Sequence, residues 1–312
     1  MDVSVILLTR NTCQQTREAI ESVFASADTL TKEIRVIDNG STDTTSSLLP
    51  ALFPEIHYKR MERNVGFARG VNSAAHDASG DFFLLLNSDA RLTRDAVRLS
   101  VEWMLGDPGC GIAGSQLLHP DGTKQNSIAN FPSLATELLN KFLLRRLWPE
   151  RFPGKEQEYG EPMEVESVVG AFFLVRREVW QKLGGMDERF FFFLEETDFC
   201  LRARQSGFAT VHLPQVHVWH GQGQTAKQDL PAARIEYWRS RYAYFAKHRS
   251  SMVCIALRCG LLLRLAVDSA VSGLLAAVTL GRSPRWTEKF VVQRALLHWH
   301  FKGCPASAGL PR

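Results

Sequence analysis

The sequence predicts a doubly wound α/β fold, with a mixed sheet flanked by helices, followed by a C-terminal helical extension. Strand-length apolar runs alternate with helix-length segments through the first 105 residues. The run Phe82–Leu86 is apolar throughout, as expected for a strand that is covered on both faces. Beyond residue 230 the pattern is helical, and 312 residues suffice for one large domain with an appendage.

The first part of the chain alternates strand and helix in order. Strands are predicted at Val3–Thr9, Glu33–Ile37, Ile56–Lys59 and Phe82–Leu86. Helices are predicted at Thr12–Ala25, Gly66–Ala78 and Thr93–Leu105, with Thr93 as the N-cap of the last. Such alternation is typical of an open sheet that binds ligands at the carboxyl ends of its strands.

The alternation weakens after about residue 110. The expected elements are a turn at Leu117–Gly122, a variable excursion over 129–160, a strand at Val165–Val175 broken at Gly170, a helix at Glu195–Gln205 stopped by Gly207, an extended segment at Val211–Trp219 and a flexible loop at Gly221–Gln224. Only helix is predicted after residue 230.

Charge is unevenly distributed along the chain. Residues 231–312 contain thirteen lysines and arginines but three acidic residues, a net charge of +10. Since the whole chain carries +4, residues 1–230 carry −6. We therefore expect the basic tail to contact an anionic membrane surface. A nucleic-acid-binding tail would need a recognition motif, which the tail lacks, so no nucleic acid partner is expected.

The apolar part of this tail has two interpretations. Met252–Leu280 is interrupted by Arg258, Arg264 and Asp268, and three charges disfavour a simple transmembrane helix. A basic amphipathic helix lying in the membrane interface is the favoured interpretation. A helix packed on the catalytic domain is the alternative.

Several classes of protein are excluded by missing patterns. Six scattered cysteines without a CxxC pair argue against a zinc site or a disulfide framework and favour a reducing compartment. The N-terminus lacks the features of a secretory signal, so a cytoplasmic location is expected. No GxxxxGK[ST] occurs, and no GxGxxG follows a strand, which disfavours nucleoside triphosphatases and dinucleotide-dependent dehydrogenases.

The strongest functional signal is Asp81–Asp89, an apolar strand that ends in polar residues. Asn87, Ser88 and Asp89 lie at its carboxyl end, where open α/β sheets bind their ligands. A cluster of hard oxygen ligands there suits a divalent cation that bridges to a diphosphate. The alternative is a simple turn followed by a helix cap.

Two further segments have nucleotide-binding chemistry. Asp38 opens the turn Asp38–Asp43, where its carboxylate is placed to accept hydrogen bonds from a ribose hydroxyl or a base edge. Asn64–Asn72 opens a helix, where Gly66 allows close backbone approach to an anion and Arg69 is a candidate phosphate contact. The alternatives are an Asx-rich turn and a tightly packed helix with a surface arginine.

An acidic helix start supplies the candidate general base. Glu195, Glu196 and Asp198 follow directly after the apolar segment Phe190–Leu194. Apolar surroundings raise a carboxylate pKa and suit it to base catalysis, whereas the alternative role is to complement the helix dipole. His220 precedes a glycine-rich loop and is a candidate metal or phosphate contact, although a lone histidine is more often structural.

Taken together and in order, these motifs resemble those of the family 2 glycosyltransferases, which have the GT-A fold. The matching segments are Val3–Asn11, Val36–Asp43, Asn64–Asn72, Leu86–Asp89, Gly170–Ala171, Gly184–Glu188, Phe190–Gly207 and His220. The likeness covers roughly residues 1–250 and is greatest to the bacterial rhamnosyltransferase-like branch. It implies a catalytic domain over 1–230, with a nucleotide-sugar half at 1–115 and an acceptor half at 116–230, and a helical extension over 231–312.

The resemblance also implies roles for matching positions around the donor. The residues expected at the donor and its supporting helix are Thr9, Arg10, Asp38, Asn64, Gly66, Arg69, Asn87 and Arg202. Asp89 and His220 are expected to hold Mg²⁺ or Mn²⁺. Since Asn87 replaces the usual first acid of the metal-binding motif, the diphosphate itself would hold more of the cation.

The implied catalytic residues are Glu196, Glu195 and Asp198. Glu196 matches the usual base, Glu195 competes with it, and Asp198 supports their helix. The implied reaction moves rhamnose or another hexose, with inversion, from dTDP-rhamnose or a UDP-sugar to a polysaccharide or lipid-linked glycan at the inner face of the cytoplasmic membrane. A nucleotidyltransferase on a similar sheet and a non-catalytic sugar-nucleotide or glycan-binding module are the alternatives.

Overall fold

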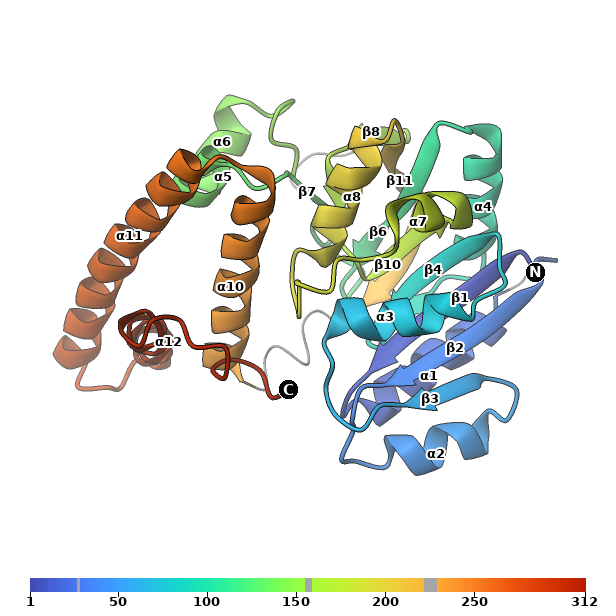
Figure 1. The fold of residues 1–312 in the computed structure, drawn as a ribbon, viewed down its shortest axis with the longest axis horizontal. Coiled ribbons are helices and arrows are strands. Elements are labelled where there is room, and N and C mark those ends of the chain that lie inside the picture. Colours follow the sequence, from blue (N-terminus) through green and yellow to red (C-terminus); the bar gives the residue numbers. More distant parts are fainter. Residues whose placement is uncertain (27–28, 155–158, 222–228) are drawn as a thin grey trace.

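The computed structural model describes residues 1–26, 29–154, 159–221 and 229–312. A nine-stranded mixed sheet lies between two layers of helices, and three long C-terminal helices stand beside it (Figure 1). The α/β class and the C-terminal helices that the sequence predicts are therefore confirmed.

The strands are β1 (Val3–Thr9), β2 (Lys32–Asp38), β3 (His57–Arg60), β4 (Phe82–Asn87), β5 (Ala90–Leu92), β6 (Cys110–Leu118), β8 (Met163–Val165), β10 (Phe172–Arg176) and β11 (Ala209–His220). Their order is β3-β2-β1-β4-β10-β6-β11-β5, and β8 also pairs with β11. Strands β3, β2, β1 and β4 run parallel to one another, whereas β10 is antiparallel to both β4 and β6. A separate ribbon joins β7 (Ile128–Ala129) to β9 (Ser167–Val168).

The helices are α1 (Cys13–Phe24), α2 (Thr45–Leu52), α3 (Phe67–His76), α4 (Ala96–Gly106), α5 (Leu134–Leu138), α6 (Lys141–Leu147), α7 (Arg177–Leu183), α8 (Glu195–Gln205), α10 (Leu230–His248), α11 (Ser251–Val278) and α12 (Pro284–Phe301). Helices α1, α2 and α4 pack on one face of the sheet, and α3, α7 and α8 on the other.

Strand β4 illustrates why the central strands are apolar throughout. Phe82, Leu84 and Leu86 belong to the core beneath α1 and α4, whereas Phe83 and Leu85 belong to the core beneath α3, α7 and α8. Successive side chains of a strand point to opposite faces, so a strand covered on both sides needs apolar residues at every position.

The predicted elements are confirmed where a continuous apolar or helical pattern marks them. Strand β1 and helix α8 have the predicted bounds, and the other early elements differ by a few residues. Helices α2 and α7 and strand β5 were not predicted. The N-cap prediction is wrong: Asp95 precedes α4, and the Thr93 hydroxyl instead donates to the His217 carbonyl (2.7 Å).

The central strand β6 is the largest omission from the predicted fold. It is buried at every position, yet small and polar residues interrupt its apolar pattern. Gly114 is needed because a Cβ there would lie 2.5 Å from the Val168 side chain. The single broken strand predicted for Val165–Val175 is also wrong, since β9 and β10 are separate strands in different sheets. The loop predicted at Gly221–Gln224 lies outside the described residues, apart from Gly221.

The C-terminal helices pack on the sheet domain through α5 and α8. Tyr244, Phe245 and Leu261 are buried in one apolar cluster together with Phe190, which precedes α8. The Ser240 hydroxyl donates to the Phe192 carbonyl (2.8 Å). A domain boundary at residue 230 stays a prediction, although the last strand ends at residue 220 and α10 begins at residue 230.

Helix α11 is long and apolar enough to cross a membrane, by length and composition alone. Its most apolar window has a mean hydropathy of 1.8, and 22% of that window is buried. Leu257, Leu261 and Leu265 face α10 and α12, whereas Leu263 and Leu274 on the outer face are 68% and 65% exposed. The packed face and the exposed apolar face thus lie on opposite sides of one helix.

Candidate active site

A cavity of about 340 Å³ lies at the carboxyl ends of β1 and β4, and we call it the strand-end cavity. Because the strands are parallel, their register places Thr9 beside Asp38 and Leu8 beside Asn87. Six of the predicted site residues line the cavity: Thr9, Arg10, Asn64, Gly66, Asn87 and Asp89. The strand ends therefore gather motifs that are far apart in the sequence, at the edge where such sheets bind ligands.

Asp38 is fully buried at the end of β2 and is not part of the cavity lining. Its carboxylate accepts hydrogen bonds from the Ser41 amide (2.8 Å) and the Tyr58 hydroxyl (2.7 Å). Burial and this hydrogen bond raise the pKa of the Tyr58 hydroxyl well above its ordinary value, so Tyr58 remains a donor. Asp38 thus holds the turn that presents the next residue, Asn39, to the cavity.

Asn39 organises the loop that leads into α3. Its Nδ2 donates to Asn64 Oδ1 (2.8 Å), and its Oδ1 accepts from the Val65 amide (2.8 Å). Gly66 follows with φ +88°, and a Cβ there would lie 2.7 Å from the Phe191 carbonyl oxygen. Glycine is therefore required where the start of α3 meets the 190–194 segment.

Arg10 gives the strand-end cavity an unused hydrogen-bond donor. Its Nε is buried and has no hydrogen-bond partner in the described parts of the chain. Buried polar groups normally have a partner, so this atom indicates a missing acceptor. A base or phosphate oxygen in the cavity would supply one.

Asp89 and His220 form a pair at the edge of the cavity. His220 Nε2 lies 3.4 Å from Asp89 Oδ1, and both side chains are nearly buried. His220 Nδ1 lies 3.0 Å from Gln125 Oε1, while Gln125 Nε2 donates to the His220 carbonyl (2.6 Å). Since Gln125 Oε1 can only accept, Nδ1 carries a proton, and Nε2 is the ring nitrogen that faces Asp89. A carboxylate and an oriented imidazole are a donor set that fits a divalent cation.

The two carboxylates at the start of α8 have different surroundings. Glu195 is buried, and its Oε2 has no hydrogen-bond partner among the described residues. Burial and the neighbouring Glu196 carboxylate raise the pKa of Glu195 well above its ordinary value. Burial also raises the pKa of Glu196, which is the more exposed of the two. This pair can hold a proton on Glu195 while Glu196 acts as a base.

Two backbone connections link these carboxylates to the strand-end cavity. The Asn87 amide donates to the Ala171 carbonyl (3.1 Å), and a Cβ on the preceding Gly170 would lie 3.7 Å from Glu196 Cβ. On the other side, Phe193 and Leu194 have φ of +73° and +67° immediately before α8. Non-glycine residues in this region are strained, and such strain often marks functional sites.

Asp198, Arg202 and Arg69 lie outside the lining of the strand-end cavity, as do Asp38, Glu195, Glu196 and His220. Asp198 is fully buried and binds Arg202 (2.8 Å), Lys247 (2.6 Å) and His248 (2.7 Å). Arg202 also donates to the carbonyls of residues 183 and 185 (2.9 Å each). Arg69 is 60% exposed and pairs with Glu188 (2.8 Å). Asp198 and Arg202 therefore connect α8 to α10 and to the segment after α7.

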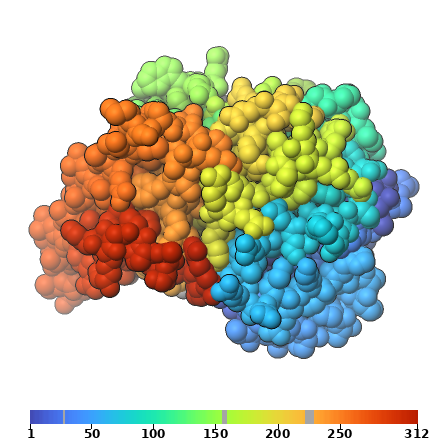
Figure 2. Space-filling model, in the orientation of Figure 1, coloured from blue at the N-terminus to red at the C-terminus, as the bar shows by residue number. Residues whose placement is uncertain are grey.

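The C-terminal segment reaches the strand-end cavity from the far end of the chain. Leu310 and Pro311 belong to its lining, and the Pro311 carbonyl accepts a hydrogen bond from Asn64 Nδ2 (2.7 Å). The Arg312 guanidinium lies 4.5 Å from the Phe191 ring centroid. Figure 2 shows this red segment meeting the blue N-terminal part of the molecule.

Comparison with known protein families decides the assignment. The model of the family described as glycosyl transferase family 2 matches residues 4–184, more than half of the chain. The chain is a family 2 glycosyltransferase. This assignment selects the glycosyltransferase reading over a nucleotidyltransferase and over a non-catalytic binding module.

Curated relatives of this glycosyltransferase include two bacterial rhamnosyltransferases. The N-acetylglucosaminyl-diphospho-decaprenol L-rhamnosyltransferase of Mycobacterium tuberculosis is 27% identical over 295 residues, which is 88% of this chain and 94% of the relative. Rhamnosyltransferase WbbL of Escherichia coli is 26% identical over 183 residues, or 57% of this chain and 67% of the relative.

Solved structures of glycosyltransferases share the fold. The mannosyltransferase PcManGT of Pyrobaculum calidifontis, in complex with GDP-Man and Mn²⁺, has a TM-score of 0.57 at 16% identity and covers 96% of this chain and 86% of its own. S. aureus TarS 1–349 has a TM-score of 0.52 at 15% identity, with 97% of this chain and 88% of its own covered. The predicted GT-A fold of this glycosyltransferase is thus confirmed.

Sequence reasoning missed several residues of the glycosyltransferase site. Asn39 lies within a recognised motif, and its position after Asp38 was a usable signal. Gln125 and the pair Leu310–Pro311 carry no such signal, because their contacts at the site join segments about 95 and 247 positions apart.

Proposed function

We propose that this glycosyltransferase moves a sugar, with inversion at the anomeric carbon, from a nucleoside diphosphate sugar to a hydroxyl group of a lipid-linked glycan. The observation that supports this best is the junction of the strand-end cavity with the Glu195–Glu196 pair through Gly170 and Ala171. A donor cavity beside carboxylates of raised pKa is the arrangement that base-assisted sugar transfer requires.

The donor we propose is dTDP-rhamnose, with UDP-sugars as the next class. The support is the rhamnosyltransferase name of the relative that aligns over 94% of its length. Arg10 Nε offers a hydrogen bond to a base, a ribose or a phosphate oxygen in the strand-end cavity, which Asn39 and Asn64 also line.

We propose that Asp89 and His220 hold a divalent cation, and that Mn²⁺ is preferred to Mg²⁺. Mg²⁺ favours oxygen ligands, whereas Mn²⁺ accepts an imidazole more readily. No cluster of three or more His, Cys, Asp or Glu side chains that could hold a metal occurs among the described residues, so the donor's diphosphate would have to supply further ligands. When bound, the cation would supply positive charge that neutralises the leaving diphosphate.

In the proposed reaction, Glu196 accepts the proton of the acceptor hydroxyl as that oxygen attacks the anomeric carbon. The new glycosidic bond forms on the face opposite the breaking bond to the diphosphate, so the configuration inverts. Glu195 keeps its proton, since a second charge in this buried place is costly. Asp198 and Arg202 fix α8, and Arg69 acts at the rim of the site rather than on the donor phosphates.

We also propose that the enzyme works at the cytoplasmic face of a membrane. Exposed apolar side chains follow one another along the outer face of α11: Met252, Ile255, Leu263, Val267, Val271, Leu274 and Val278. The surrounding tail carries a charge of +10. An apolar face among basic residues is the pattern of a helix that lies in an anionic membrane interface.

The test combines donor binding with turnover in two variants, Glu196→Gln and Glu195→Gln. Thermal shifts with dTDP-rhamnose and UDP-hexoses, each with Mn²⁺ or Mg²⁺, rank donors because stabilisation follows concentration over Kd. We expect Glu196→Gln to keep the donor-dependent stabilisation and to lose turnover about 10²–10⁴-fold. Full turnover by Glu196→Gln together with an inactive Glu195→Gln would move the base to Glu195. An absence of stabilisation by every nucleotide sugar would refute the proposed donor class.

A further inference from the structure

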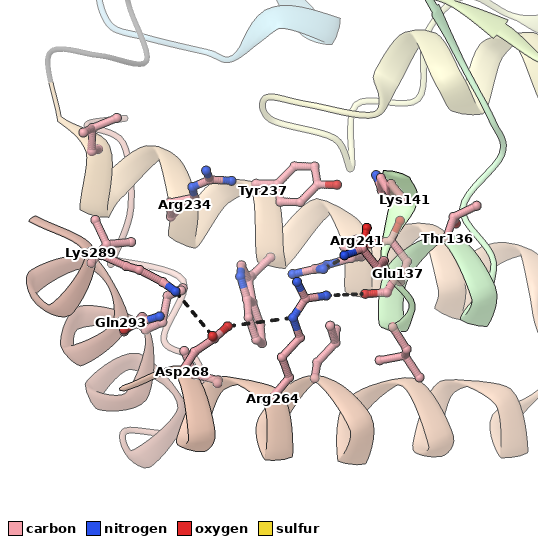
Figure 3. Close-up of a pocket in the computed structure, with 18 of the residues that line it drawn as sticks. Thr136, Glu137, Lys141, Arg234, Tyr237, Arg241, Arg264, Asp268, Lys289 and Gln293 are labelled. Carbon is pink, nitrogen blue, oxygen red and sulfur yellow. Dashed lines mark hydrogen bonds and ion pairs between the residues drawn. The ribbon is translucent and has the colours of Figure 1, made fainter. Parts of the chain in front are cut away.

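A second and larger cavity lies among α10, α11, α12 and α5, and we call it the helical cavity (Figure 3). Its volume is about 1070 Å³, against about 340 Å³ for the strand-end cavity. The two cavities share no lining residue. Pockets for drug-sized ligands are ~300–1,000 Å³, so the helical cavity suits a ligand at least that large.

The lining of the helical cavity has a surplus of positive charge. It contains three acidic side chains and six basic ones, which are Lys141, Arg234, Arg241, Arg264, Arg285 and Lys289. Arg264 and Lys289 both approach one of the acids, Asp268, at 3.8 and 3.4 Å. Arg234 and Arg285 form no ion pair with any residue that the structure describes. Unpaired guanidinium groups around a cavity favour a multiply charged anion such as a diphosphate.

Arg241 is a buried donor within this lining. It is held by Glu137 at 3.0 Å and stacks over the Trp238 ring at 4.6 Å from the centroid. The side chain is 8% exposed, yet its Nε has no hydrogen-bond partner among the described residues. Figure 3 shows Arg241, Glu137 and Arg264 converging where α10, α5 and α11 meet. An unpartnered buried N–H at this point indicates that an acceptor belongs in the cavity.

Much of the remaining lining is apolar, although Thr136, Asn140 and Gln293 also belong to it. Leu138, Leu261, Leu265 and Leu296 contribute to it, and Phe142 on α6 is 66% exposed. Helix α11 contributes Leu261, Leu265 and Arg264 to the cavity, while its opposite face is apolar and exposed. A lining with both a cationic and an apolar part matches an amphiphile that carries phosphate groups on a hydrocarbon chain.

The helical cavity adjoins the segment that carries the candidate base. Tyr237 lines the cavity, and its ring lies 5.6 Å from that of Phe193, three residues before Glu196. Burial and the Glu137 carboxylate raise the pKa of the Tyr237 hydroxyl. A ligand in the helical cavity can therefore extend along Tyr237 toward the base.

We propose that the helical cavity binds the diphosphate and the first apolar units of a lipid-linked acceptor, with Arg234, Arg241 and Arg285 contacting the phosphates. The sugar on that diphosphate then extends past Tyr237 toward Glu196. The binding of a lipid diphosphate stands by itself, whereas its role as the acceptor rests on the proposed function.

The first test measures binding of farnesyl diphosphate, inorganic pyrophosphate and farnesol by isothermal titration calorimetry. The variant is Arg234→Gln/Arg285→Gln, and the matched control is Arg282→Gln/Arg294→Gln. All four arginines are exposed on the C-terminal helices or the turn before α12, and the control pair lies outside the cavity lining. We expect farnesyl diphosphate to bind the unaltered protein more tightly than either fragment. The variant should lose about tenfold in affinity while the control stays within twofold, as two charge-assisted contacts imply.

Equal losses in the variant and the control would overturn the proposal, since the effect would then reflect overall charge. Phosphatidylglycerol vesicles distinguish the bilayer from the acceptor as the source of phosphate. Loss of vesicle binding in the variant, with farnesyl diphosphate binding intact, would assign these arginines to membrane headgroups and refute the acceptor site.

Kinetics separates this proposal from the proposed function. With a lipid-diphosphate-linked sugar as acceptor, the variant should raise the acceptor KM about tenfold and leave the donor KM unchanged. If the unaltered protein consumes no nucleotide sugar but binds farnesyl diphosphate through these arginines, the proposed function fails and the lipid diphosphate site stands. If transfer occurs and the acceptor KM does not change, the helical cavity is not the acceptor site.

Discussion

At the scale of single residues, Glu195 and Glu196 show how neighbouring groups acquire different roles. Both are glutamates at the start of α8, and burial raises the pKa of both. Glu195 has the additional repulsion of the Glu196 carboxylate, and its Oε2 has no hydrogen-bond partner in the described parts of the chain. The less exposed residue is therefore the better place for a retained proton, and the more exposed one is free to meet a substrate hydroxyl.

The raised pKa of Glu196 predicts the pH dependence of turnover. A base is active when deprotonated, so the rate should be maintained above the pKa of Glu196 and fall as the pH decreases through it. Since that pKa lies above the ordinary value of 4.5, the acid limb of the kcat profile should have its midpoint above pH 4.5. Glu195→Gln should leave the limb nearly unchanged, because Glu195 is already neutral. A midpoint at or below pH 4.5, in protein shown by circular dichroism to stay folded, would contradict this assignment.

At the scale of elements, α8 is held by charge as well as by packing. Asp198 has no exposed surface and binds three cationic or protonatable side chains, of which Lys247 and His248 belong to α10. These contacts suit the helix-supporting role expected for Asp198, which stays a prediction. The segment Phe190–Leu194 completes the arrangement, as Phe191 and Phe192 line the strand-end cavity and Phe193 meets α10.

We predict that Asp198→Asn weakens the joint between α8 and α10. Removing one partner of a buried ion pair leaves the other charges uncompensated, which typically costs about 3–5 kcal/mol of unfolding free energy. Chemical denaturation provides the measurement. The comparison variant is Glu102→Gln, whose partner Arg98 is at the surface, and it should cost less than about 1 kcal/mol. Similar losses in the two variants would show that Asp198 does not anchor the helix.

At the scale of the whole molecule, the C-terminal helices have three structural roles. They form the helical cavity, they pack against α8, and they leave the outer face of α11 exposed. The C-terminal segment also returns to the sheet domain, where Leu310 and Pro311 line the strand-end cavity. The proposed donor site, the proposed base and the proposed acceptor site therefore depend on one continuous packing arrangement.

The exposed face of α11 predicts that the protein binds membranes, and that both apolar contacts and positive charge contribute to this binding. Leu263→Gln/Leu274→Gln should reduce cosedimentation with phosphatidylglycerol vesicles about tenfold or more, because both side chains lie on the exposed face. Leu52→Gln/Leu105→Gln alters two exposed leucines of the sheet domain and should have little effect. Binding that depends equally on both pairs, or on neither, would argue against an interfacial α11.

The sequence by itself determined the α/β class, the carboxyl end of β1, those of β2 and β4 to within one residue, and the motifs that line the strand-end cavity. These depend on local patterns, namely apolar runs, turn residues and strand ends, which remain visible without knowledge of distant contacts. Strand β6 escaped prediction because its glycines are explained by neighbours such as Val168 rather than by its own pattern.

Only the tertiary structure decided what each polar group does. It buried Asp38 and Asp198 in the interior, brought Gln125 to His220, and brought Leu310 to the strand-end cavity. It also assembled the helical cavity from α5, α10, α11 and α12. In the sequence, the basic residues of α10, α11 and α12 appear only as a net positive charge of the tail. The physical reason is that burial and long-range hydrogen bonds set the state of a charged group, and both arise when distant segments pack together.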